Sequence, residues 1–192
     1  MSPEIETSNI IIRKARIDDA NDWSDILYNS IKNTYTRFEN VPESILDFYN
    51  KDKLKTKFLE DINSCNSEKS KIELYMLVFN GDSAGILKIG EPIKFYVDGH
   101  NYYRDNIDGI GEIKTLHIKE EFRGKGIGSR AIVFAENRLK ELNYRMFHIW
   151  VKKPNKNAID FYKKMGFTET NFINPNTSDK IPSIVLEKEI DL

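Results

Sequence analysis

The chain has 192 residues, 40% of them hydrophobic, which is enough apolar material for one domain with one core. Its 29 lysines and arginines nearly balance 30 aspartates and glutamates, so it lacks the basic surplus typical of nucleic-acid-binding domains. No segment approaches the ~20 apolar residues of a transmembrane helix, and the polar residues 1–9 do not read as a signal peptide, so we expect neither a membrane nor a nucleic acid as partner.

The first third of the chain is predicted to form one strand and two helices. The β-branched run 10–12 is typical of a buried strand, and apolar residues at helical spacing predict a helix over 19–35. A second helical region is expected within 40–63, followed by a polar loop over 64–70. The lone cysteine, Cys65, lies in that loop without a neighbouring His to activate it, so we expect an inert thiol. Because one thiol cannot form an internal disulfide, we expect a reducing compartment, the cytoplasm.

A hairpin and a long loop follow. Strands are predicted over 74–79 and 84–89, joined by the tight turn 80–82, because Asn-Gly is a strong hairpin signal. The segment 91–109 is rich in Asp, Gly, Asn and Tyr and is predicted to be irregular. Loops of this length in a small domain tend to be functional or disordered.

The C-terminal half alternates strands and helices. Strands are expected over 112–118, 146–151, 167–172 and 183–190. Helices are expected over 127–142 and from Asn155 or Asn157 to Met165, with Gly166 just past the second helix. Because no repeat and no linker interrupts the pattern, we predict one α/β domain over 1–192.

A glycine-rich turn lies between the strand 112–118 and the helix after it. Residues 123–128 read Arg-Gly-Lys-Gly-Ile-Gly, and three glycines in five positions let backbone N–H groups turn toward a ligand. The next helix directs its positive dipole end to the same point. The turn therefore suits a pyrophosphate, with Arg123 or Lys125 adding charge; a glycine turn without a ligand is the alternative.

Two widespread phosphate-binding motifs do not fit this turn. The Rossmann motif G-x-G-x-x-G differs in spacing, and the next strand ends Ile149-Trp150-Val151 without the acidic ribose ligand. The Walker A pattern, which needs G-K-[ST] after four intervening residues, is absent from the sequence.

A second motif begins 32 positions after Arg123. Residues 155–167 read Asn-Lys-Asn-Ala-Ile-Asp-Phe-Tyr-Lys-Lys-Met-Gly-Phe, and one helix and one strand separate the two motifs. The pair resembles the two signature regions of the GNAT family of N-acetyltransferases, R/Q-x-x-G-x-G/A and N-x-x-A-x-x-x-Y-x-x-x-G-F. Both match without a gap and in the right order. The resemblance covers about residues 111–170, and its second part is similar to bacterial polyamine acetyltransferases.

The resemblance implies an α/β GNAT fold: a mixed, largely antiparallel sheet of about seven strands, with helices on both faces and a splay between central strands 4 and 5. It also implies acetyl-CoA as cosubstrate and no metal. In this family the pantetheine arm lies in the splay, which begins at a bulge, like an extra strand. The implied cofactor-binding residues are Leu116, His117, Ile118, Arg123, Gly124, Lys125, Gly126, Ile127, Gly128, Ser129 and Asn155.

These residues have different implied roles. Backbone groups of 116–118 would pair with the pantetheine amides, and one N–H there would polarise the thioester carbonyl. The amides of 124–129 would hold the pyrophosphate. Asn155 would hydrogen-bond to the pantetheine arm.

The resemblance implies Tyr162 and Glu112 as catalytic residues. Tyr162 would be the general acid, because a phenol with a pKa near about 10 can protonate a leaving thiolate whose thiol has a pKa of about 8.5. Packing beside Phe161 is the alternative role. Glu112 would act through water as the base that deprotonates the amine. A solvated charge at the strand end is the alternative for Glu112, and His117 is the alternative base.

The acceptor is expected to be the primary amine of a small molecule such as a polyamine, attacking the thioester directly. A protein N-terminus or lysine is the alternative, and a non-catalytic CoA-binding regulatory domain is a third reading. The segments 40–63 and 91–109 flank the acceptor groove in this fold. The sequence is compatible with a homodimer. Charged and aromatic residues near the long loop could attract a polycation, unless they form a solvated loop: Asp98, Asp105, Asp108, Glu112, Tyr96, Tyr102 and Tyr103.

Overall fold

The computed structural model describes residues 9–38, 49–65, 71–92, 96–97, 100–101, 109–174 and 181–191. The strands are β1 (Ile10–Lys14), β2 (Ile72–Phe79), β3 (Asp82–Gly90), β4 (Tyr96–Val97), β5 (His100–Asn101), β6 (Ile110–Ile118), β7 (Met146–Lys152), β8 (Thr168–Asn174) and β9 (Ser183–Glu189). The helices are α1 (Ala20–Tyr35), α3 (Lys51–Cys65), α4 (Ile127–Glu141) and α5 (Lys156–Lys164), with short 3-10 helices η1 (Ile17–Asp19) and η2 (Glu120–Phe122).

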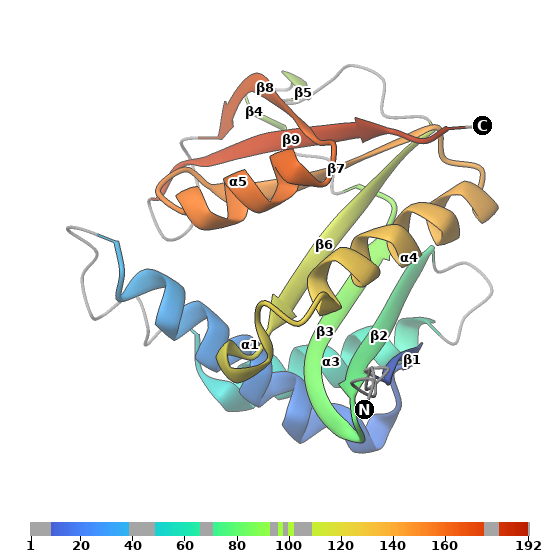
Figure 1. The fold of residues 1–192 in the computed structure, drawn as a ribbon, viewed down its shortest axis with the longest axis vertical. Coiled ribbons are helices and arrows are strands. Elements are labelled where there is room, and N and C mark those ends of the chain that lie inside the picture. The colour runs from blue at the N-terminus through green and yellow to red at the C-terminus, as the bar shows by residue number, and fades with distance from the viewer. Residues whose placement is uncertain are drawn as a thin grey trace, which may run out of the picture.

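Seven strands form one mixed sheet in the order β1-β2-β3-β6-β7-β9-β8, while β4 and β5 pair separately. Within the sheet only β6 and β7 run parallel among the described pairs. They pair from Ile110, opposite Met146, to Ile113, opposite Ile149, and then separate. Figure 1 shows them as two arms that meet near the C-terminus and diverge. They are the fourth and fifth strands of this sheet in chain order, so the predicted fold class, including the central splay, is confirmed.

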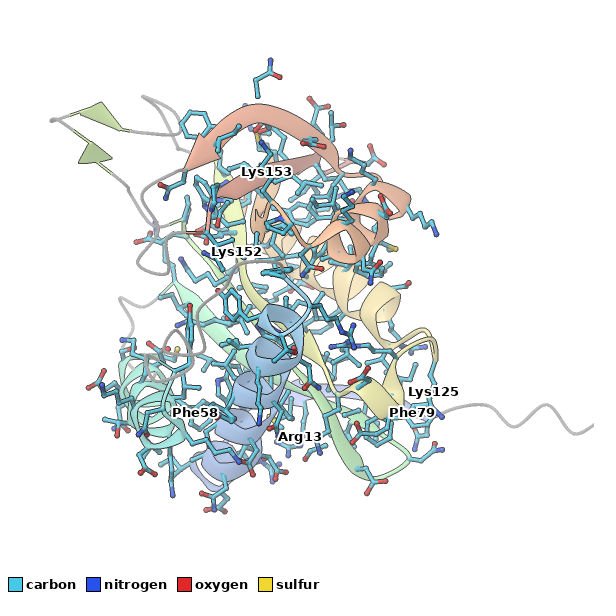
Figure 2. The ribbon with its side chains drawn as sticks, turned by 90° about the vertical axis from the view of Figure 1, so that its left-hand side faces the viewer. Arg13, Phe58, Phe79, Lys125, Lys152 and Lys153 are labelled. Atoms are coloured by element: carbon cyan, nitrogen blue, oxygen red, sulfur yellow. The ribbon has the colours of Figure 1, made fainter. Side chains whose placement is uncertain are left out.

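Helices cover both faces of the sheet (Figure 1). On one face α1 and α3 place Trp23 and Phe58 with their ring centroids 4.9 Å apart, and both pack into a core with Met76 of β2. Figure 2 shows Phe58 on α3 beside α1. On the other face α4 and α5 form the larger core, which includes Leu77 and Ile132. Met76 and Leu77 enter different cores because successive strand residues point to opposite faces.

Several predicted boundaries, including those of β6 and α3, and the content of the long loop need correction. β6 begins at Ile110 instead of residue 112, because Ile110 and Gly111 already pair with β7. α3 continues to Cys65, which therefore ends a helix instead of lying in a loop. The Cys65 thiol donates to the carbonyl oxygen of Ile72 over 2.9 Å. The segment 91–109, predicted to be irregular, contains the short β4–β5 pair.

The hairpin predicted between β2 and β3 is confirmed. Asn80 and Gly81 have φ angles of 51° and 93°, and positive φ at both central residues is what a type I′ turn requires.

Among the helices that the structure describes, none is long and apolar enough to cross a membrane.

Candidate active site

The gap between β6 and β7 opens next to a bulge in β6. Ile89 of β3 lies opposite Ile113 but Lys88 lies opposite Thr115, so Lys114 is an extra residue in β6. Such a bulge bends its strand and increases the local twist. Beyond Ile113 none of the described strands pairs with the β7-side edge of β6, and this edge is free to bind an extended ligand.

The backbone of β6 presents two of the three predicted pantetheine-binding residues to this gap. The N–H of Lys119 donates to the carbonyl oxygen of Ala84 over 2.9 Å, so Lys119 faces β3. Because hydrogen-bonding direction alternates along an antiparallel strand, His117 also faces β3, and Leu116 and Ile118 face the gap. We therefore infer that Leu116 and Ile118 are the residues whose backbone groups can pair with a ligand.

The side chain of His117 points to α1. Its Nδ1 lies 2.7 Å from the hydroxyl oxygen of Ser30 in a hydrogen bond. Burial, and then the positive charge of Arg123, lower the pKa of His117 to about 4. The side chain of His117 is therefore held against α1 by Ser30, and its imidazole is a weaker base than that of an ordinary histidine.

The glycine turn between η2 and α4 has the conformation of an anion-binding loop. Gly124 and Gly126 have φ angles of 76° and 78°, in the left-handed region that side-chain-bearing residues rarely adopt. Gly126 is the N-cap of α4, and the first N–H bonded within the helix is that of Arg130, to the carbonyl oxygen of Gly126. The preceding helix amides have no acceptor inside α4, as at any helix start, and can bind an anion.

Three residues of the segment 123–128 make contacts that the sequence did not reveal. A Cβ on Gly128 would lie 3.2 Å from the ring of Phe161, so this glycine lets α4 pack closely against α5. The Lys125 ammonium lies 5.4 Å from the centre of the Phe79 ring, at the end of β2 (Figure 2). Arg123 instead points back along β6, where its Nε donates to the carbonyl oxygen of Ile118 over 3.2 Å.

The second motif forms α5 and the residue before it. Asn155 is the N-cap, and its side-chain oxygen accepts from the N–H of Ala158 over 3.3 Å, which leaves the amide NH₂ as the group suited to donate to a ligand. Tyr162 is buried, with its ring centroid 5.1 Å from Phe161 and 5.5 Å from Phe167. Burial raises the pKa of Tyr162, so its phenol stays protonated across the physiological range.

Glu112 is buried, with 4% of its surface exposed, so the alternative of a solvated strand-end charge is wrong. Its Oε2 lies 3.0 Å from Nζ of Lys114 and 3.8 Å from Nε2 of His148. His148 is directly opposite Glu112 in the β6–β7 register. Neither Lys114 nor His148 was identified from the sequence, although Glu-x-Lys on a strand places both side chains on one face.

Glu112 and Tyr162 approach the gap from opposite faces of the sheet. Ile113 belongs to the core under α4, and a Cβ on Gly111 would meet Leu139 of α4. Glu112, between them, therefore points to the face that carries α1 and α3. Tyr162 belongs to the α4 core. A ligand in the gap would thus have the proposed base on one side and the proposed acid on the other.

Most of the predicted acceptor features lie outside the described residues. These are Asp98, Asp105, Asp108, Tyr102, Tyr103 and the segment 40–48, and for Tyr96 the structure describes its place in β4. Within the described part of the chain, no group of three or more His, Cys, Asp or Glu residues is arranged to hold a metal ion.

Comparisons with known proteins agree with this geometry. Residues 42–167 match the model of the Acetyltransferase (GNAT) family. An uncharacterized N-acetyltransferase of Methanocaldococcus jannaschii is 37% identical over 82 residues, which are 42% of this chain and 36% of that protein. The thialysine N-ε-acetyltransferase of Sus scrofa is 27% identical over 90 residues, 45% of this chain and 48% of that protein. The chain thus matches less than half the length of these two relatives.

A solved structure shares the fold over nearly the whole chain. It is the PaiA N-acetyltransferase of Thermoplasma acidophilum in complex with coenzyme A, with a TM-score of 0.67 and 20% identity. The similarity covers 94% of this chain and 99% of that one.

Proposed function

The chain belongs to the acetyltransferase (GNAT) family, because more than half of its residues match the family model. We propose that it transfers an acetyl group from acetyl-CoA to the primary amine of a small molecule. The observation that carries the donor half is the gap between β6 and β7, which opens toward the glycine turn and the start of α4. The acceptor half rests on the buried carboxylate of Glu112 beside that gap.

The donor would lie along the free edge of β6. Backbone groups of Leu116 and Ile118 would pair with the pantetheine amides, and Asn155 would donate to the same arm from the other side. The amides of 124–129, at the positive end of α4, would hold the pyrophosphate with Arg123 or Lys125 nearby. Two backbone features and one side-chain amide thus suit one elongated ligand with an anionic pyrophosphate, which is the main support for acetyl-CoA as cosubstrate.

The bound thioester supplies an activated acetyl carbon, and the residues of the chain manage two protons. Glu112 would take a proton from the acceptor amine, directly or through water, as the N–C bond forms. An N–H at Leu116 would stabilise negative charge on the carbonyl oxygen. Tyr162 would give its proton to the sulfur as the C–S bond breaks. Burial raises the pKa of the phenol, which makes Tyr162 a weaker acid. Burial also disfavours a thiolate beside it, so the free-energy difference between phenol and thiol as proton carriers changes little.

A small-molecule acceptor is supported by the name of one relative. The relative from Sus scrofa is named for a small amino-acid acceptor, thialysine.

The experiment that tests the function is acetyl-CoA turnover against a panel of polyamines, thialysine and related amino acids, aminoglycosides, and peptides with free N-termini. We expect release of free CoA with at least one small amine, and mass spectrometry should find the acetyl group on its nitrogen. Turnover with peptides alone would support the protein acetyltransferase alternative. Binding of acetyl-CoA without turnover of any amine would support the regulatory alternative.

A further inference from the structure

Glu112 and Lys114 form a buried ion pair at the point where β6 leaves β7. Nζ of Lys114 donates to Oε2 of Glu112 over 3.0 Å, and the side chains are 8% and 5% exposed. His148 lies on the other strand, with Nε2 at 3.8 Å from the same oxygen. Three ionisable groups thus meet beside the gap, and the proposed reaction uses only Glu112.

Burial creates a difficulty for the proposed base. A carboxylate out of water is disfavoured relative to the neutral acid, and a neutral acid cannot accept a proton. A cation at hydrogen-bonding distance reverses this preference, since it stabilises only the ionised form. Lys114 provides such a cation, and its own burial means that water contributes little to the solvation of its charge.

Strand alternation explains why Lys114 reaches Glu112, because residues two apart on a strand lie on the same face. Lys114 is also the extra residue of the β6 bulge, between the pairs Ile113–Ile89 and Thr115–Lys88. The ion pair therefore lies where β6 stops pairing with β7.

Two other charged groups of the described residues lie near this pair. Lys88 of β3 forms an ion pair with Asp61 of α3. Glu187 of β9 lies opposite His148 in the sheet, one strand further from Glu112. Lys114 lies at hydrogen-bonding distance from Glu112, and His148 is a second neighbour.

We infer that Lys114 is a positioning residue for the base: its ammonium keeps the buried Glu112 carboxylate ionised at the acceptor side of the gap. The inference rests on the proposed function, because it assigns Lys114 a task in that reaction. The alternative role for Lys114 is that of a competitor, in which its ammonium occupies the position of the acceptor amine and blocks binding.

The test compares Lys114→Gln, which removes the charge, with Lys114→Arg, which keeps it. Two quantities are measured: the pH dependence of kcat/KM, and the ¹³C NMR titration of the Glu112 carboxyl group, assigned with Glu112→Gln. In Lys114→Gln the acid limb of the kcat/KM profile and the Glu112 titration should both move up by on the order of one pH unit or more. Lys114→Arg should stay close to the wild type in both.

Lys88→Gln is the matched control, because it also removes a lysine that forms an ion pair on an adjacent strand. Its partner is Asp61, so the Glu112 titration should not move. A Glu112 titration that is unchanged in folded Lys114→Gln would overturn the inference. A lower KM for the acceptor with an unchanged kcat and acid limb would overturn it in favour of the competitor role.

A measurement on the wild type covers the case in which Lys114→Gln does not fold. Glu112 should titrate no higher than an ordinary glutamate, at about pH 4.3, despite its burial. Titration well above that pH would contradict the inference directly. Because the NMR experiment needs no acceptor, it separates a failure of the Lys114 assignment from a failure of the proposed function.

Discussion

Tyr162 shows how one side chain can serve both packing and chemistry. Its ring contacts Phe161 and Phe167 within the core, and burial raises the pKa of its hydroxyl group. A buried phenol of this kind is held in one orientation by its neighbours and keeps its proton until a stronger base forms nearby. The packing role is visible in the structure, and the general-acid role stays a prediction.

Tyr162→Phe removes the hydroxyl group and preserves the ring contacts. If Tyr162 is the general acid, kcat should fall about 100-fold or more, while the affinity for acetyl-CoA changes little. Steady-state kinetics and calorimetric titration measure the two effects. The control is Tyr144→Phe, which removes a hydroxyl from a half-buried tyrosine just past the C-terminal end of α4. Equal turnover in wild type and Tyr162→Phe would exclude the acid role.

The buried pair of Glu112 and Lys114 should be visible in stability as well as in activity. Removing one partner leaves a buried charge unpaired, and we expect Glu112→Gln to lower the free energy of unfolding by on the order of 3 kcal/mol. The double variant Glu112→Gln with Lys114→Met should recover much of that loss. Denaturant unfolding of the two single variants and the double variant measures the coupling. Additive effects would mean that the two groups do not interact.

At the scale of elements, the glycine turn and α4 work as one unit. Gly126 ends the turn and begins the helix, so its backbone conformation sets the direction in which the first amides of α4 point. An added Cβ would meet no atom within 4 Å, so the constraint on this residue is its positive φ and not the available space.

Gly126→Ala should therefore cost about 1–2 kcal/mol of stability and also weaken acetyl-CoA binding, because relaxing the strain would move the amides. Gly81→Ala is the matched control: Gly81 has a φ of 93°, equally open surroundings and a place in the β2–β3 hairpin. Unfolding experiments should show comparable losses in both variants, and calorimetry should show weaker binding in Gly126→Ala alone. Equal affinity in both would remove the turn from the binding site.

A second element-scale contact links β2 to its neighbours. Glu73 of β2 accepts hydrogen bonds from Arg138 of α4 and from the hydroxyl of Tyr75, and its carboxylate pairs with Lys14 of β1. Burial opposes the ionisation of Glu73, but the hydrogen bonds from Arg138, Lys14 and Tyr75 outweigh it and lower its pKa to about 2.

This contact makes the stability depend on pH at the acid end. The folded-state pKa of about 2 lies below the unfolded value of about 4.5, so the contribution of Glu73 is complete above pH 4.5 and is lost as the pH falls toward 2. Glu73→Gln should therefore be less stable than the wild type at pH 7, by roughly 1–2 kcal/mol after allowance for solvent screening, and the difference should shrink below pH 4. Denaturant unfolding between pH 2 and 7 measures it. Glu141→Gln, which removes the exposed partner of Arg138, should show little effect.

At the scale of the whole molecule, the sheet consists of two parts joined over a short distance. The strands β1, β2, β3 and β6 form one part and β7, β9 and β8 the other, and four residue pairs connect β6 to β7. A ligand in the gap would touch both parts and would extend this connection. Binding should therefore stabilise the molecule as a unit.

Saturating acetyl-CoA should raise the melting temperature. At 100 times its Kd a ligand that binds only the folded state adds about 2.7 kcal/mol, which corresponds to a shift of roughly 5–10 °C for a chain of this size. Thermal unfolding followed by circular dichroism measures the shift, with acetyl phosphate as a control that carries the acetyl group without the pantetheine. Absence of any shift at saturating concentration would contradict the donor half of the proposed function.

The sequence alone was sufficient to predict most of the strands and helices and to identify the two motifs of the family. Periodicity located most of the strands and helices because the core-facing side of each strand and of each helix is apolar. The glycine turn and the segment 155–167 could be recognised because each is a contiguous motif, so its residues are visible in the local sequence. The single domain over 1–192 and the individual site residues stay predictions.

The tertiary structure decided which distant groups meet. The burial of Glu112 and its position opposite His148 depend on the parallel register of β6 and β7. The close packing of Gly128 on Phe161 depends on how α4 lies against α5. A bulge adds one residue without a sequence signal of its own, and register is set by the whole sheet. Local sequence therefore determined the glycine turn proposed to bind the donor, and only the assembled sheet determined that the proposed base is buried opposite His148.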